Sequence, residues 1–234
     1  MNDKGPSDNG FSEHWSWDVP DVAGSLCAVS DVLAATTNIA RMLAVGARTL
    51  TLVTEETVES VRVRSGGALI VGESRRLPRN FFSVSNHPSD IFRADFRGKD
   101  IVYMSNNGTR VISDMLDRGA ESVTAVSFVN ISASSTFLKR EGSRNIIGIA
   151  AGERTYPDKH APEDRRCISV LRQIYTGKHV DWDTVFSTLN DEMQRYYSLN
   201  FWKEDVLYVL KKDTCPVTPV FHRDEDGTIG AVSL

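Results

Sequence analysis

Short apolar runs alternate with helical patterns along this chain from residue 25 onwards. Runs of mainly aliphatic residues predict strands, and apolar residues that recur every three or four positions predict the helices between them. The predicted strands are residues 25–30, 48–53, 68–72, 100–105, 122–127 and 145–150. The predicted helices are residues 36–45, 55–64, 109–118, 131–140, 163–176 and 183–197. Strands and helices that alternate in this way are typical of βαβ units and a largely parallel sheet.

The two ends of the chain depart from this alternation. Residues 1–24 are polar and rich in Gly, Pro and Asp, which predicts a flexible leader. Residues 206–234 predict a strand, a loop and a hairpin that turns at Asp226 and Gly227. We therefore expect residues 25–234 to form a single α/β domain. Its expected architecture is a three-layer α/β/α sandwich around a largely parallel or mixed sheet.

Residues 36–53 and 109–126 resemble each other at a constant offset of 73 positions. Eight of the eighteen positions are identical, and they include Thr36 with Thr109 and Gly46 with Gly119. Convergence on a strand–helix–strand pattern explains the apolar and glycine matches, but it explains the threonines less well. An internal βαβ duplication and convergence both stay open. In either case we expect the loops that precede the two helices to open at the same edge of a parallel sheet.

Composition excludes several classes of protein. Of the 234 residues, 41% are hydrophobic and 25% are charged, which is ordinary for a globular chain. The net charge of −4, with no basic block, disfavours nucleic acid as a partner. The three cysteines have no metal-type spacing, no signal-peptide pattern begins the chain, and no apolar run approaches a membrane span. We expect a cytoplasmic protein that binds neither nucleic acid nor membrane.

Asp31 directly follows the first predicted strand, and two threonines, Thr36 and Thr37, come after it. The carboxyl ends of parallel strands are where α/β proteins place ligand chemistry. Aspartate and threonine are also good helix caps, so Asp31 or Thr36 could simply cap the following helix. The stretch by itself leaves both interpretations open.

The equivalent loop of the second unit is Ser105-Asn106-Asn107-Gly108-Thr109. Asparagine and glycine tolerate left-handed backbone, which lets successive N–H groups converge on an anion. The start of the following helix adds its own N–H groups and the positive end of its dipole. An ordinary capped turn is the alternative.

Two further loops carry charged side chains. Glu73 directly follows the third strand, and the arginines after it suit phosphate, sulfonate or carboxylate oxygens, although a solvated basic loop is the alternative. Asp164 stands in the first turn of the helix that Pro162 begins, and we expect its side chain to point back toward the sheet edge.

Acids without a His or Cys cluster suit a hard cation such as Mg²⁺. With arginines and N–H groups they favour phosphoryl chemistry. Neither a P-loop pattern nor a dinucleotide-binding glycine pattern is present.

These motifs, in this order, resemble the 2-phosphosulfolactate phosphatase family of Mg²⁺-dependent acid phosphatases, which form sulfolactate in coenzyme M biosynthesis. Residues 31–37 resemble the family's D-V-L-R-A-T-T, and residues 105–109 resemble its T-T-N-G-T. Glu73 and Asn86 stand at the spacing of its G-E-R and G-N-S-P elements. Asn130 resembles the asparagine of its L-N-A element, and Asp164 the acid of its E-D-x-x-C helix start. The resemblance spans residues 25 to 221.

The resemblance implies Mg²⁺-dependent hydrolysis of a small-molecule phosphate monoester. It implies metal ligation by Asp31, Glu73 and Asp164, with Asp164 a third ligand or a base that activates water, and Asp31 as a nucleophile stays open. The implied catalytic residues are Asp31, Glu73, Asp164 and Asn107. The implied substrate- and phosphate-binding residues are Thr36, Thr37, Arg75, Asn86, Gly108, Thr109 and Asn130.

The departures from the family's pattern predict an altered substrate. Ala34 and Ser74 stand where the family has arginines, and His87 stands where it has a serine. Losing two arginine forks removes donors that would hold anionic groups. We expect a specialised metabolite, nucleotide or sugar phosphate as substrate. The alternative is a non-catalytic anion-binding or interaction protein on the same scaffold. A homodimer is a further open expectation.

Overall fold

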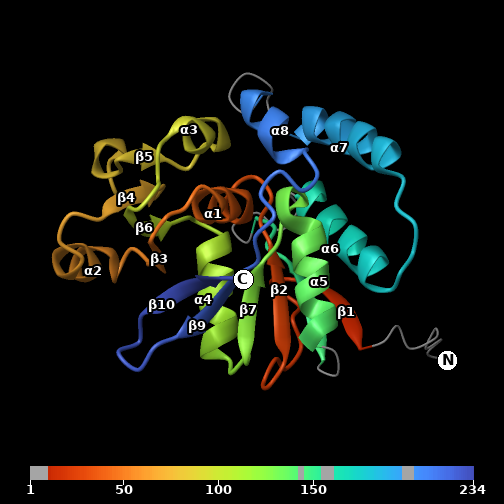
Figure 1. Cartoon of the computed structure of the whole chain (residues 1–234), viewed down its shortest axis with the longest axis horizontal. Coiled ribbons are helices and arrows are strands. Elements are labelled where there is room, and N and C mark those ends of the chain that lie inside the picture. The colour runs from red at the N-terminus through yellow and green to blue at the C-terminus, as the bar shows by residue number, and fades with distance from the viewer. Residues whose placement is uncertain (1–9, 142–144, 154–160, 197–202) are drawn as a thin grey trace.

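All ten strands of the described chain lie in one sheet, in the order β1-β8-β2-β7-β9-β10-β3-β6-β4-β5 (Figure 1). The structure is a computed structural model that describes residues 10–141, 145–153, 161–196 and 203–234. The strands are β1 (Phe11–Trp15), β2 (Leu26–Ser30), β3 (Thr49–Leu52), β4 (Leu69–Gly72), β5 (Val84–Ser85), β6 (Asp100–Met104), β7 (Ser122–Ala125), β8 (Ile146–Ala150), β9 (Pro219–Arg223) and β10 (Ile229–Ser233). The helices are α1 (Ala35–Ala44), α2 (Val58–Arg64), α3 (Pro88–Arg93), α4 (Gly108–Asp117), α5 (Ile131–Glu141), α6 (Pro162–Tyr175), α7 (Trp182–Tyr196) and α8 (Lys203–Val209).

The α/β class and the mixed sheet are confirmed, and each of the six predicted strands and six predicted helices is present. The predicted hairpin is also confirmed, because β9 and β10 pair antiparallel on either side of Asp226 and Gly227. The strand expected from residue 206 is wrong, since this segment is α8. Its valine, leucine and tyrosine residues fit both the two-residue period of a strand and the 3.6-residue period of a helix. Packing against α3 selects the helix and buries Asp205 and Val209, which are four residues apart.

The sheet consists of two parallel halves joined by the β9–β10 hairpin. Strands β1, β8, β2 and β7 are parallel to one another, and so are β3, β6, β4 and β5. The pairs β7–β9, β9–β10 and β10–β3 are all antiparallel, so the two halves run in opposite directions along the sheet. The sheet is strongly curled, more like a half-barrel than the flat layer of a three-layer sandwich.

This topology corrects the expectation that the two equivalent loops share one edge of a continuous parallel sheet. The loops follow β2 and β6, which belong to opposite halves. They nevertheless meet, because the curl of the sheet brings the two strand ends together, as the contact between Asp31 and Gly108 shows. The two loops therefore lie together as predicted, although they belong to opposite halves of the sheet.

The internal repeat extends beyond the residues that revealed it. The elements β2-α1-β3-α2-β4 are followed by β6-α4-β7-α5-β8 in the same order and with similar lengths. Counted inwards from the two ends of the sheet, β2 and β6 are both third, β3 and β7 are both fourth, and β4 and β8 are both second. The strand order is therefore symmetric about the β9–β10 hairpin, which supports duplication over convergence.

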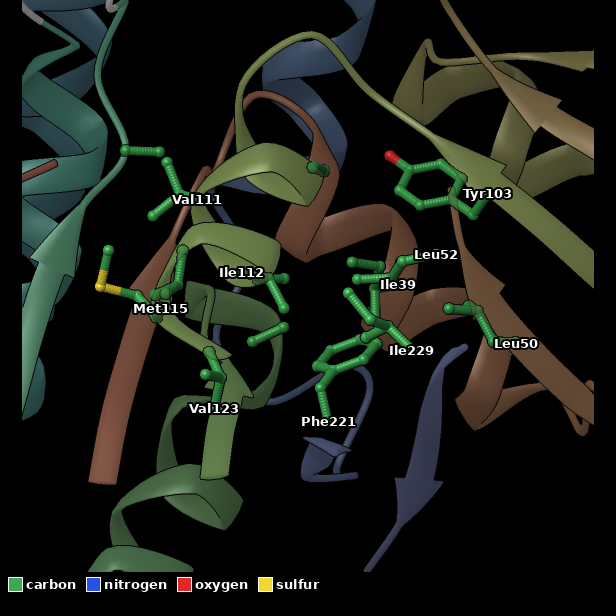
Figure 2. Close-up of a cluster of buried hydrophobic side chains, with 14 of the residues drawn as sticks. Ile39, Leu50, Leu52, Tyr103, Val111, Ile112, Met115, Val123, Phe221 and Ile229 are labelled. Carbon is green, nitrogen blue, oxygen red and sulfur yellow. The ribbon is translucent and has the colours of Figure 1, made fainter. Parts of the chain in front are cut away.

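A shared core holds the two repeat units against the hairpin. Figure 2 shows Ile39 of α1 and Ile112 of α4 in one cluster with Phe221 of β9 and Ile229 of β10. Ile39, Ile112 and Phe221 are fully buried. Complete burial of side chains of this size contributes about 1.5–3 kcal/mol each. The core therefore fixes the relative positions of α1 and α4, and with them the positions of the two loops that precede these helices.

The segment predicted as a leader contributes to the sheet where the structure describes it. Residues 11–15 form β1, an edge strand that pairs with β8. The rings of Trp15 and Trp17 stack at a centroid distance of 5.0 Å, and both pack against Gly152. Residues 1–9 lie outside the described residues. Within the described chain, no helix combines the length and the apolar character that crossing a membrane requires.

Candidate active site

Asp31 caps a helix, but it caps the helix of the other repeat unit. Its Oδ2 accepts a hydrogen bond from the N–H of Gly108, the first residue of α4, at 2.7 Å. Its own following helix, α1, has no side-chain cap. The carboxylate is 7% exposed and lies between the first turns of α1 and α4. Asp31 therefore does cap a helix and lies at the start of the second loop's helix, whereas its part in ligand chemistry stays a prediction.

The paired threonines of the repeat perform the same task in both units. Thr36 Oγ1 accepts the N–H of Asp31 at 3.1 Å and donates to its carbonyl at 2.9 Å. Thr109 Oγ1 makes the same two bonds with Ser105, at 3.1 and 2.8 Å. Thr37 donates to the carbonyl of Val32 at 2.7 Å. These three buried hydroxyls hold the loops in place, and their direct contact with a phosphate stays a prediction.

Glu73 directly follows β4, and its charge acts on Asp31. Its N–H donates to the carbonyl of Met104 at 3.1 Å, which fixes the backbone beside β6. Within the described residues, its carboxylate forms no hydrogen bond or ion pair. The pKa of Asp31 is raised from 3.8 to about 6, mainly by burial and in part by the charge of Glu73. The N–H of Gly108 opposes this rise.

Asp164 points back toward the sheet edge, as its place in the first turn of α6 predicts. Its Oδ1 accepts the N–H of Val32 at 2.7 Å, and its Oδ2 accepts the N–H of Gly152 at 3.0 Å. It therefore ties the loop after β2 to the loop after β8. Burial raises its pKa well above the usual range, and the charges of Glu163 and Asp31 add to that effect.

Among the described residues, no group of three or more His, Cys, Asp or Glu side chains is placed to hold a metal ion. The structure therefore does not assemble Asp31, Glu73 and Asp164 as a three-residue site. Mg²⁺ commonly takes only one or two protein carboxylates, and substrate phosphate and water complete its shell. Asp31 and Glu73 fit that requirement, because they are two mutually repelling acids and Glu73 has unengaged oxygens.

The loop before α4 faces a polar cavity of about 600 Å³. The N–H groups of Gly108 and Thr109, predicted to bind phosphate, are taken by Asp31 and by the hydroxyl of Ser105. Asn106 and Asn107 line the cavity instead, together with Glu73. The lining also includes the cations Arg75, Arg76 and Arg110.

The three arginines of the cavity differ in their partners. Arg75 forms an ion pair with Glu153 at 3.2 Å, and Arg76 forms one with Glu55 at 3.1 Å. Arg110, in the first turn of α4, has no ion-pair partner within the described residues. The other arginine considered for the site, Arg154, lies outside the described residues.

Two predicted asparagines are engaged in internal hydrogen bonds. Asn86 Oδ1 accepts the hydroxyl of Tyr103 at 2.5 Å and the amide of Asn38 at 3.1 Å. Asn130 Nδ2 donates to the carbonyls of Ala125 and Val217, both at 3.0 Å. Both side chains thus position the loops around the site, and their contact with substrate stays a prediction.

A pair formed by His87 and Asp205 was not predicted. His87 Nδ1 lies 2.8 Å from Asp205 Oδ2, and Asp205 Oδ1 accepts the N–H of Ser89 at 2.7 Å. The sequence showed that His87 departs from the family's pattern. It gave no signal for Asp205, because the segment that begins at residue 206 was expected to be a strand.

Comparisons with known proteins match most of this chain to one family. A sequence model described as 2-phosphosulpholactate phosphatase matches residues 16–183. A probable 2-phosphosulfolactate phosphatase of Symbiobacterium thermophilum is 30% identical over 224 residues, covering 86% of this chain and 93% of the relative. Proteins with the same description from Thermoplasma acidophilum and Thermoplasma volcanium are each 26% identical. They cover 82% and 92% of this chain, and 84% and 94% of their own lengths.

Proposed function

Because the chain belongs to the 2-phosphosulfolactate phosphatase family, we propose that it hydrolyses a small-molecule phosphate monoester with the help of Mg²⁺. The observation that carries the proposal is the meeting of two carboxylates with the start of α4. Asp31 contacts Gly108, and Glu73 lies close enough to raise the pKa of Asp31. A polar cavity opens beside Glu73 and Asn107.

In this proposal the phosphoryl group binds beside Glu73 and the loop before α4. The transferring phosphoryl group spreads negative charge over its three outer oxygens, so catalysis depends on donors and cations fixed around it. Asn106, Asn107 and Arg110 line the cavity at this place and offer such groups. Bound Mg²⁺, held by Asp31 and Glu73, would neutralise charge on the phosphoryl oxygens.

The buried hydrogen bonds around the loops support the same proposal. Thr36 and Thr109 each clamp the end of a strand, and Asp164 joins the loops after β2 and β8. Such groups keep the reacting surface in place, so little reorganisation is needed during the reaction. Asp164 acts here through its two backbone contacts, because both of its oxygens are occupied by N–H groups.

We also propose that the substrate differs from 2-phosphosulfolactate. The hydroxyl of Ser74 donates to Glu55 and accepts the N–H groups of Arg76 and Leu77. This position therefore has no guanidinium group that could bind an anion. Ala34 is 3% exposed and offers no charged donor either. The cavity of about 600 Å³ suits a nucleotide, sugar or other metabolite phosphate larger than sulfolactate.

The test is phosphate release from a panel of phosphate monoesters, with Mg²⁺ present and after chelation. We expect release that requires Mg²⁺, and we expect Asp31→Asn to reduce it by about 100-fold or more, as for loss of one electrostatic catalytic group. Glu59→Gln is the matched control, because Glu59 is exposed and pairs only with Arg62 among the described residues. Absence of release from every ester in Mg²⁺ would favour the non-catalytic anion-binding protein.

A further inference from the structure

His87 and Asp205 form a pair that the proposed function has not yet used. His87 directly precedes α3, and Asp205 lies in the first turn of α8, which packs against α3. Asp205 is 1% exposed, and its two oxygens meet His87 Nδ1 at 2.8 Å and the N–H of Ser89 at 2.7 Å. The carboxylate is therefore fixed, and it fixes the imidazole ring in turn. A buried carboxylate on Nδ1 orients an imidazole so that Nε2 faces its reaction partner.

Acidic groups surround the ring. The hydrogen bond with Asp205 raises the pKa of His87, and the charges of Asp205, Asp90 and Glu73 raise it further, against an opposing effect of burial. Burial alone would raise the pKa of Asp205, but the bonds from His87 and Ser89 outweigh it and lower that pKa. Nearby Arg93 pairs with Glu204. The folded surroundings of the ring therefore favour its protonated form more strongly than solvent does for a free imidazole.

The pair follows a strand that neighbours the proposed phosphoryl site. Gly72 of β4 pairs with Ser85 of β5 in parallel, so Glu73 and His87 come one and two residues after adjacent strand ends. Glu73 lines the cavity, and its charge acts on His87. Asn86, the residue before His87, is fixed by the hydroxyl of Tyr103 at 2.5 Å. Burial raises the pKa of Tyr103 well above its usual range, and the charges of Asp31 and Glu73 add to that effect. The ring itself keeps 25% of its side chain exposed, so it is accessible to a ligand.

We propose that His87, held by Asp205, is the general acid that protonates the leaving-group oxygen of the phosphate ester. This inference rests on the proposed phosphatase function and names one further catalytic residue for it. Asp205 is a positioning residue, because it acts through the imidazole. An alkoxide is a poor leaving group, so a positioned proton donor typically contributes about 10²–10⁴-fold to its departure.

The step balances without a further reactant. The bond between phosphorus and the ester oxygen breaks, its electron pair stays on that oxygen, and the proton of His87 Nε2 goes to the same oxygen. A water oxygen bonds to phosphorus and gives dihydrogen phosphate. One proton of that phosphate then returns through solvent to the imidazole. The net reaction is ester plus water to alcohol plus hydrogen phosphate.

The test compares two esters in the wild type and in His87→Gln. One is the best alkyl phosphate of the panel, and the other is p-nitrophenyl phosphate, whose nitrophenolate departs without a proton. We expect His87→Gln to lower kcat for the alkyl ester by about 100-fold or more. For p-nitrophenyl phosphate we expect less than a tenfold loss. We expect Asp205→Asn to give the same selectivity with a smaller loss. His222→Gln, on the exposed part of β9, is the control and should change neither.

A pH profile of the wild type tests the same step without a variant. kcat for the alkyl ester should fall on the alkaline side, and kcat for p-nitrophenyl phosphate should not. Equal losses for both esters in His87→Gln, no loss for the alkyl ester, or identical alkaline limbs would overturn the role of His87. Those results would leave the phosphatase function standing, whereas a wild type that hydrolyses neither ester would remove both.

Discussion

At the scale of single residues, Asp31 shows a conflict between stability and function. Its carboxylate is 7% exposed and faces the charge of Glu73, yet an N–H group of α4 bonds to it. A buried charge is kept in such a place only at a cost in folding free energy. The raised pKa expresses that cost, because the folded chain favours the protonated, neutral form.

We predict that Asp31→Asn stabilises the metal-free protein at pH 8. The pKa of Asp31 rises from 3.8 to about 6 on folding, so the protonated form is favoured by the fold. The stabilisation from that proton is fully present below pH 3.8 and is lost as pH rises through about 6. At 1.36 kcal/mol for each pKa unit, the loss amounts to about 3 kcal/mol. Asparagine avoids this loss and keeps an acceptor for Gly108.

Thermal unfolding in chelator at two pH values measures the effect. The Tm of Asp31→Asn should exceed that of the wild type by about 6–12 °C at pH 8, and the difference should shrink toward zero near pH 4. Asp100→Asn is the comparison of opposite sign, because hydrogen bonds from Arg48 and Thr49 lower the pKa of the half-buried Asp100 to about 2, so its loss should lower the Tm at pH 8. A lower Tm for Asp31→Asn at pH 8 would show that its charge stabilises the fold.

At the scale of elements, each repeat unit depends on the other for the geometry of its loop. Asp31, directly after β2, supplies the carboxylate that caps α4, so Asp31 and the start of α4 must lie close together. A Cβ on Gly108 would lie 2.6 Å from the Cβ of Ala35 and 2.7 Å from Asp31 Oδ2. Only glycine permits this approach of the two units.

We predict that Gly108→Ala separates the start of α4 from Asp31. Because the clash involves buried side chains from two elements, stability should fall by about 1–3 kcal/mol and phosphatase activity should fall with it. Gly66→Ala is the matched control, since a Cβ there meets nothing within 4 Å. Denaturant unfolding and phosphate release measure the two effects. Unchanged activity and stability in Gly108→Ala would mean that the close contact is dispensable.

At the scale of the whole molecule, the curled sheet brings acids from two opposed halves to one place. Asp31 follows β2 in one half, and Glu73 follows β4 in the other. A divalent cation between them would relieve their mutual repulsion and link the two halves. Binding to the folded state alone raises stability by mass action. The expected homodimer stays a prediction.

We predict that Mg²⁺ raises the Tm of the wild type. At a concentration of about 100 times Kd, the stabilisation is about 2.7 kcal/mol, equivalent to a rise of about 5–10 °C. Glu73→Gln should lose most of this rise, because it removes one of the two charges, whereas Glu59→Gln should keep it. An equal rise in the wild type and Glu73→Gln would exclude Glu73 as a ligand.

Local patterns were enough to predict much of the fold and part of the site. The predicted strands and helices of both repeat units are present, because continuous apolar runs and helical periodicity are local properties. The candidate acids stand where the sequence placed them, with Asp31 and Glu73 directly after β2 and β4 and Asp164 in the first turn of α6. The paired threonines also pointed to a shared role, and the structure shows that role to be a backbone clamp.

The sequence by itself determined the elements and their order, because these follow from side-chain pattern and turn chemistry along the chain. Tertiary structure decided which elements meet. The β9–β10 hairpin separates the two halves and sets them in opposite directions, and only the curl of the sheet reunites their loops. Packing against α3 made residues 203–209 helical and brought Asp205 to His87, 118 positions apart. Contacts over such separations depend on how the core packs, which no local pattern records.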